Sequence, residues 1–243
     1  MTRLSLNINK FATLRNARGG NLPNLIDVAL DCERFGAEGI TVHPRPDERH
    51  ITYRDVYDLN NKLTTEFNIE GYPSKQFLKT IFEVSPDQCT LVPDSPDVLT
   101  SDQGWDTIKH KTFLKDVISE LKTKGVRVSL FMENDLKKID CAKEVNADRI
   151  ELYTGPYAHN FNKGKESSIE AFVNAAEHAR KIGLDINAGH DLNLINLPYL
   201  IERIPFIKEV SIGHALICDA IYYGLENTIQ MYLRSLKPVN VFI

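Results

Sequence analysis

Short runs of apolar and β-branched residues alternate with longer segments of helical periodicity, and this alternation repeats eight times along the chain. Each run is four to six residues long, which is typical of a buried strand. In the segments between them, apolar residues recur every three or four positions, as on the buried face of a helix. This alternation favours a parallel sheet, because each helix returns the chain to the same edge of the sheet.

Eight strand–helix units are the number that closes a parallel sheet into a (β/α)8 TIM barrel, so we expect one barrel domain over residues 1–243. The predicted strands are residues 4–9, 39–43, 64–69, 89–92, 127–132, 149–153, 185–188 and 209–212. The predicted helices are residues 23–35, 53–60, 74–84, 113–124, 136–145, 168–182, 194–202 and 216–236. An open doubly wound sheet is the alternative, although no predicted strand is followed by G-x-G-x-x-G. The longest irregular segments, residues 93–109 and 155–166, are expected to be loops over the carboxyl ends of the strands.

Composition limits the partners and the compartment. A formal net charge of −4 argues against nucleic acid. No apolar stretch approaches the roughly 20 residues that span a bilayer, and no signal peptide precedes the first strand. The four cysteines are far apart in apolar segments, so we expect buried thiols in a reducing cytoplasm: Cys32, Cys89, Cys141 and Cys218.

The second predicted strand ends in a loop that carries four basic or titratable side chains. His43, Arg45, Arg49 and His50 lie within eight residues, and the loop is stiffened by two prolines. Such a loop would present a titratable base beside an anionic ligand. A solvated basic loop is the alternative for this segment taken alone.

Other strand ends carry similar chemistry, and in a barrel all of them converge on one site. Histidine and carboxylate side chains suit proton transfer near neutral pH. The candidates are Asn7 and Asn9, Glu70, Thr100, Glu151, His190 with Asp191, and Gly213 with His214.

Glycine precedes histidine at the ends of the last two strands. Without a side chain at Gly213, backbone N–H groups at the start of the final helix can approach a phosphate. A second anion site is predicted from Arg15 and Arg18, with Arg45 and His50 across the mouth. Two anion sites around the acid–base groups predict a substrate, or a pair of substrates, with two phosphates.

Three classes of protein remain open on these residues. The first is an acid–base enzyme, since the sequence has no Walker loop or nucleophile elbow. The second is a metal-dependent barrel hydrolase or isomerase that uses His43, Glu70, Glu151 and His190 as ligands, although no H-x-H follows the first strand. The third is a non-catalytic barrel that binds phosphorylated metabolites.

Several motifs, in this order and spacing, resemble the pyridoxine 5'-phosphate synthase family over essentially the whole chain. They lie at residues 7–9, 12–19, 39–51, 187–190 and 212–215. The resemblance implies a (β/α)8 barrel with extra helices that assembles as a homo-octamer in the cytoplasm. It also implies condensation of 3-amino-2-oxopropyl phosphate with 1-deoxy-D-xylulose 5-phosphate to pyridoxine 5'-phosphate, phosphate and water, with no metal or organic cofactor.

The resemblance also implies a role for each matching residue. His43 and Glu70 would accept protons, His190 would donate one, and Glu151 would stabilise a transition state. The aminoketone phosphate would be held by Asn7, Arg18, Gly213 and His214. The deoxyxylulose phosphate would be bound by Arg45, His50 and Thr100.

This chain departs from the family pattern at two places. It has Asn9-Lys10 where the family usually has Asp-His, so Lys10 would supply a charge in place of the histidine. It has Asp191 where the family usually has glycine, and a carboxylate beside a phosphate is unfavourable. We therefore expect Asp191 to contribute only its backbone N–H to substrate binding.

Overall fold

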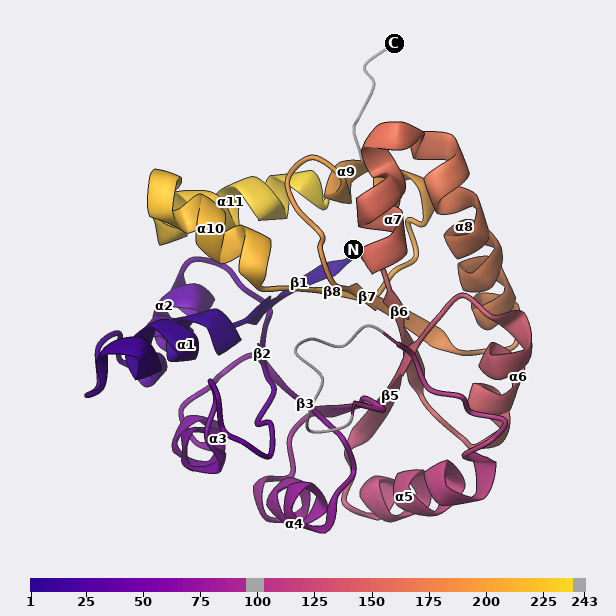
Figure 1. Ribbon diagram of the computed structural model, residues 1–243, viewed down its shortest axis with the longest axis horizontal. Coiled ribbons are helices and arrows are strands. Elements are labelled where there is room, and N and C mark those ends of the chain that lie inside the picture. The colour runs from indigo at the N-terminus through magenta and orange to yellow at the C-terminus, as the bar shows by residue number, and fades with distance from the viewer. Residues whose placement is uncertain (95–102, 238–243) are drawn as a thin grey trace.

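A computed structural model of the chain describes residues 1–94 and 103–237. Over these residues eight parallel strands form a closed barrel in sequence order, with the first strand also paired to the last (Figure 1). The strands are β1 (Arg3–Asn7), β2 (Gly39–Val42), β3 (Glu66–Gly71), β4 (Gln88–Leu91), β5 (Arg127–Met132), β6 (Arg149–Tyr153), β7 (Asp185–Gly189) and β8 (Glu209–Ile212). The (β/α)8 TIM barrel is confirmed, and the open sheet is excluded.

Helices surround the barrel (Figure 1). They are α1 (Asn9–Arg18), α2 (Leu25–Arg34), α3 (Tyr53–Asn60), α4 (Lys75–Val84), α5 (Lys111–Thr123), α6 (Leu136–Glu144), α7 (Gly155–Asn160), α8 (Lys165–Lys181), α9 (Leu197–Arg203), α10 (His214–Tyr223) and α11 (Leu225–Ser235), with a 3-10 turn η1 (Phe161–Lys163). Their apolar faces and the strands form one core with residues such as Leu4, Ile40 and Leu130 completely buried. None of the described helices combines the length and apolarity required to cross a membrane.

The amino ends of the strands are closed by buried charged and polar side chains. Arg149 donates a hydrogen bond of 3.0 Å to Gln88, and one of its nitrogens lies 3.8 Å from the Glu209 carboxylate. Arg3 lies 3.5 Å from the same carboxylate. These side chains pair with one another, as buried charges must, and together they fill the amino end of the barrel. The carboxyl ends of the strands therefore form its open end.

Four local predictions were wrong. Residues 9–18 form α1, which the sequence hides because the helix has no side-chain N-cap and no apolar stripe. The predicted loop 155–166 contains α7 and η1. The predicted helix 216–236 is two helices, because Gly224 adopts φ +77° between α10 and α11. Cys218 is exposed on α10, whereas Cys32, Cys89 and Cys141 are buried as predicted, and all four are free thiols.

Candidate functional site

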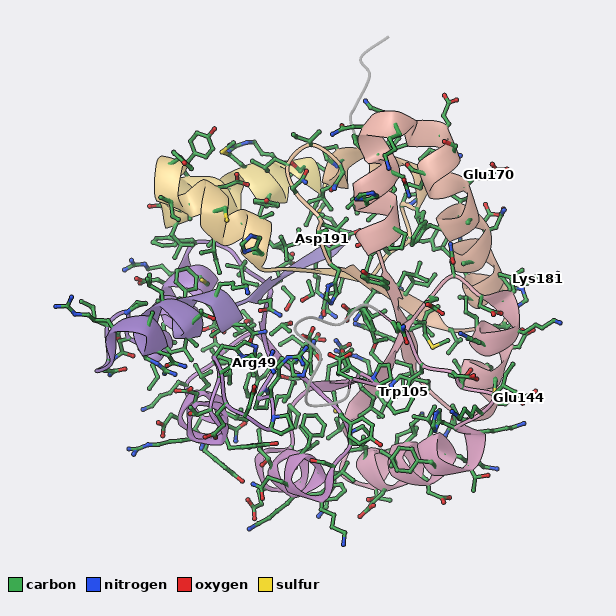
Figure 2. The ribbon with its side chains drawn as sticks, viewed as in Figure 1. Arg49, Trp105, Glu144, Glu170, Lys181 and Asp191 are labelled. Carbon is green, nitrogen blue, oxygen red and sulfur yellow. The ribbon has the colours of Figure 1, made fainter. Side chains whose placement is uncertain are left out.

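A cavity of about 900 Å³ opens at the carboxyl ends of the strands. Figure 2 shows Arg49 and Asp191 on the inner side of the ring of helices, whereas Glu144, Glu170 and Lys181 lie on its outer side. Ten of the twelve predicted site residues line the cavity: Asn7, His43, Arg45, His50, Glu70, Glu151, His190, Asp191, Gly213 and His214. The structure therefore brings together side chains from β1, β2, β3, β6, β7 and β8.

Neither Arg15 nor Arg18, which were predicted to form a second anion site, is among the residues that line the cavity. Arg18 is exposed at the end of α1. Arg15 is buried, and its guanidinium donates hydrogen bonds of 2.6 and 2.9 Å to the two carboxylate oxygens of Asp55. Arg15 therefore stabilises the packing of α1 against α3, and its predicted place in an anion site is wrong. Thr100 lies outside the described residues.

The amide side chains after β1 fix the groups at the ends of β2 and β3. Asn9 Oδ1 accepts a hydrogen bond of 2.9 Å from the backbone N–H of His43. Asn7 Nδ2 donates to Glu70 Oε2 at 3.4 Å, and His43 Nδ1 lies 3.9 Å from the same oxygen. Asn7, His43 and Glu70 thus form one cluster around a single carboxylate.

Two buried carboxyl groups in the cavity hold protons more tightly than usual. Burial, and then the negative charges of Asp94 and Glu209, raise the pKa of Glu70 to about 8. Burial and the Glu70 charge raise the pKa of Glu151 well above its usual value. Both carboxyl groups therefore resist ionisation. The raised pKa of Glu70 lies in the range that suits exchange of a proton with a substrate near neutral pH.

Three histidines of the cavity are biased towards the uncharged form. Burial, reinforced by the Arg45 charge, lowers the pKa of His43 well below its ordinary value and that of His50 to about 4. Burial also lowers the pKa of His190. A neutral imidazole has one acceptor and one donor nitrogen, so each ring can accept a hydrogen bond, or a proton, at one nitrogen and donate a hydrogen bond at the other.

At two positions in the site, a glycine allows a neighbouring group to approach the backbone closely. A Cβ atom at Gly189 would lie 2.2 Å from Glu151 Oε1, so only glycine leaves room for that carboxyl group at the end of β7. A Cβ atom at Gly213 would lie 3.0 Å from the backbone oxygen of Asn7. Gly213 is also the N-cap residue of the ten-residue helix α10, whose first N–H groups and dipole favour an anion.

Cationic groups gather at a second edge of the cavity, around His50. Arg45 is buried and lies 2.8 Å from the Asp94 carboxylate, which fixes its guanidinium at the end of β4. Lys10 and Arg49 also line the cavity, and their charges contribute to the low pKa of His50. The Asn9-Lys10 departure therefore leaves a positive charge at this edge of the cavity.

The cavity is also lined by residues that the sequence did not predict, among them Phe131, His159 and Asn193. Phe131 lies near the carboxyl end of β5, and its ring lies 5.1 Å from the ring of His190. His159 lies on α7, where no helix was predicted, and Asn193 lies two residues after Asp191. The signal that could have found them is their position near the carboxyl ends of β5, β6 and β7. Among residues 1–94 and 103–237, no three His, Cys, Asp or Glu side chains are grouped so as to hold a metal ion.

The fold and the site together define a (β/α)8 barrel with one cavity that contains acid–base groups, a helix N-terminus and a cationic edge. The family described as "Pyridoxal phosphate biosynthesis protein PdxJ" matches residues 4–238. The chain belongs to this family. It is an enzyme of vitamin B6 biosynthesis, and the pyridoxine 5'-phosphate synthase function predicted from the motifs is confirmed.

Relatives with known names agree. A pyridoxine 5'-phosphate synthase of Cytophaga hutchinsonii is 61% identical over 98% of this chain and 100% of its own length. One of Porphyromonas gingivalis is 58% identical over 97% of this chain and 99% of its own length.

Solved structures of low sequence identity share the fold alone. Phosphoribosylanthranilate isomerase of Thermotoga maritima aligns with a TM-score of 0.61 and 12% identity, over 97% of this chain and 98% of the other. Thiamine phosphate pyrophosphorylase of Pyrococcus furiosus aligns with a TM-score of 0.63 and 10% identity, over 96% and 95% of the two chains.

Proposed function

We propose that the cavity condenses 3-amino-2-oxopropyl phosphate with 1-deoxy-D-xylulose 5-phosphate to form pyridoxine 5'-phosphate, phosphate and water. One observation carries the proposal. The acid–base groups line the same cavity as two places suited to a phosphate, the N-terminus of α10 and the cationic edge around His50. Two phosphorylated substrates bound at these places would meet at the buried histidine and carboxyl groups.

The first phosphate site lies where β8 meets α10. Gly213 and the N–H groups of the first turn of α10 would hold the phosphate of the aminoketone, together with His214. Asn7 approaches Gly213 from β1 and would fix the rest of that substrate. The exposed Arg18 would act on the same substrate by the family resemblance, and this role stays a prediction.

The second phosphate site lies at the cationic edge. Arg45 and His50 would bind the phosphate of the deoxyxylulose substrate, with Lys10 supplying a further positive charge. Thr100, outside the described residues, is assigned to the same substrate by the resemblance alone. Asp191, which lies after β7 and is assigned to neither phosphate site, would contribute only its backbone N–H to substrate binding, because its carboxylate would repel a phosphate.

Proton transfers between these sites would drive the reaction. His43 and Glu70 would accept protons as the amine of one substrate adds to the ketone of the other and water leaves. His190 would donate a proton, and Glu151 would stabilise charge that develops in a transition state. Elimination of phosphate and an aldol-type ring closure then require further transfers, which several neighbouring acid–base groups can supply.

The experiment is a turnover assay with purified protein and both substrates, followed by the absorbance of pyridoxine 5'-phosphate. The native chain should form product, and Glu70→Gln and His190→Asn should fold normally and lose most of the activity. Glu170→Gln, on the outer side of α8, is the matched control and should keep full activity. Binding of both substrates by the native chain without product would support the non-catalytic barrel instead.

We also propose that the chain works in the cytoplasm as a homo-oligomer, an octamer by the family resemblance. The support on the molecule is an apolar surface on α10 and the neighbouring α1. Ile221 is 77% exposed, Tyr222 is 84% exposed, and Leu14 of α1 is 62% exposed. Because soluble proteins rarely expose such side chains together, this surface suits a second copy of the chain. Sedimentation of the native chain and of Ile221→Glu tests this: the native chain should be oligomeric, and the variant should dissociate.

A further inference from the structure

The turn that carries His190 is strained. His190 has φ +80° and the next residue, Asp191, has φ +57°, so two consecutive residues with side chains adopt the left-handed region. This conformation costs roughly 1–2 kcal/mol per residue. Such a turn persists only where its surroundings hold it in place.

Thr154 holds that turn from the neighbouring strand. It follows β6 directly and is fully buried. Its hydroxyl lies 2.6 Å from the carbonyl oxygen of Gly189 and 2.6 Å from that of His190, and donates its proton between them. Its backbone N–H donates a further bond of 2.9 Å to the Gly189 oxygen, which extends the β6–β7 ladder.

The backbone contacts act on a ring that is already confined. The His190 ring lies 5.1 Å from that of Phe131 and 5.3 Å from that of Tyr153, with the latter pair edge to face. The following carbonyl, of Asp191, accepts a bond of 3.0 Å from Asn196 Nδ2. Since both sides of the turn are held, the direction of the imidazole depends on the backbone bonds as well as on ring packing.

We propose that Thr154 is a positioning residue for His190. Its hydroxyl holds the left-handed turn and so aims the imidazole into the cavity, while Thr154 itself is not among the residues that line the cavity. The catalytic consequence of this inference rests on the proposed role of His190 as proton donor. The geometric part, the direction of the ring, does not depend on that role.

The test compares Thr154→Val, which keeps the shape and removes the hydroxyl, with Thr154→Ser, which keeps the hydroxyl. The matched control is Thr107→Val, because Thr107 is also fully buried and donates a 2.7 Å bond to a distant carbonyl, that of Lys138. For each variant kcat, KM and a crystal structure are measured. If Thr154→Val does not fold, Thr154→Ala takes its place, since it also lacks the hydroxyl.

We expect Thr154→Val to lower kcat roughly 10- to 100-fold with KM changed by less than about threefold, and to turn the His190 ring away from its position. Thr154→Ser should restore kcat, and Thr107→Val should leave it unchanged. An unmoved ring and turn in Thr154→Val, or equal loss of kcat in the serine variant, would overturn the proposal. Full activity of His190→Asn would instead show that His190 is not the proton donor. The position of the His190 ring in Thr154→Val would still decide whether Thr154 positions that ring.

Discussion

Replacing Glu70 by glutamine should make the stability of the protein less sensitive to alkaline pH. The Glu70 side chain is 12% exposed, and its pKa is raised from 4.5 to about 8, first by burial and then by the charge of Asp94. Between these two values the folded state keeps a proton that the unfolded state releases. The free energy of unfolding of the native chain therefore falls as the pH rises through this window, by at most about 1.4 kcal/mol per pH unit.

The difference between pH 4.5 and 8 sets an upper limit of about 5 kcal/mol for this effect. Because the Glu70 side chain keeps 12% of its surface exposed in the cavity, solvent screens part of its charge, and we expect roughly half of that limit. Glutamine has no proton to lose and can still accept the hydrogen bond from Asn7 Nδ2, so the variant should escape this loss.

Urea unfolding at pH 5, 6.5 and 8.5 measures the effect, at one fixed protein concentration because association also contributes to stability. The stability of Glu70→Gln relative to the native chain should increase by about 2–3 kcal/mol from pH 5 to pH 8.5. Glu170→Gln should show no such trend. A difference that stays constant with pH would refute the reasoning, because it would mean that Glu70 does not hold its proton in the folded state.

Two further substitutions test other parts of the site. Gly189→Ala would place a Cβ atom 2.2 Å from Glu151 Oε1. We expect kcat to fall at least roughly tenfold while the circular dichroism spectrum stays unchanged. Full activity would show that the Glu151 carboxyl group can move without consequence. Arg15→Ala removes both hydrogen bonds to the Asp55 carboxylate. Thermal unfolding should show a free energy of unfolding lower by about 2–3 kcal/mol, and steady-state kinetics should show an unchanged KM. An unchanged melting temperature would mean that the pair adds nothing to stability.

The sequence predicted the strands better than the connections between them. All eight strands overlap the predicted runs, because each strand buries apolar and β-branched residues that stand out against the polar turns around it. Helix α3 was predicted at its observed bounds, and it begins with a capping box formed by Thr52 and Asp55. Helix α1 was missed because its buried side chains, Ala12 and Arg15, do not form an apolar stripe.

The site was predicted from strand ends, and the predicted residues at or directly after a strand end line one cavity. His43, Glu70 and His190 line the cavity because the barrel points every strand the same way. Residues further from a strand were less predictable. Arg15 was assigned to an anion site from its charge alone, and only the fold shows that Asp55 of α3 lies against it.

The central claim is that one cavity holds two phosphate groups beside its acid–base residues. Diffraction from crystals of the native chain soaked in inorganic phosphate tests it directly. The account predicts two phosphate ions in the cavity, one at the N-terminus of α10 beside Gly213 and one beside Arg45 and His50. Phosphate bound only outside the cavity, or a cavity that binds none, would contradict it.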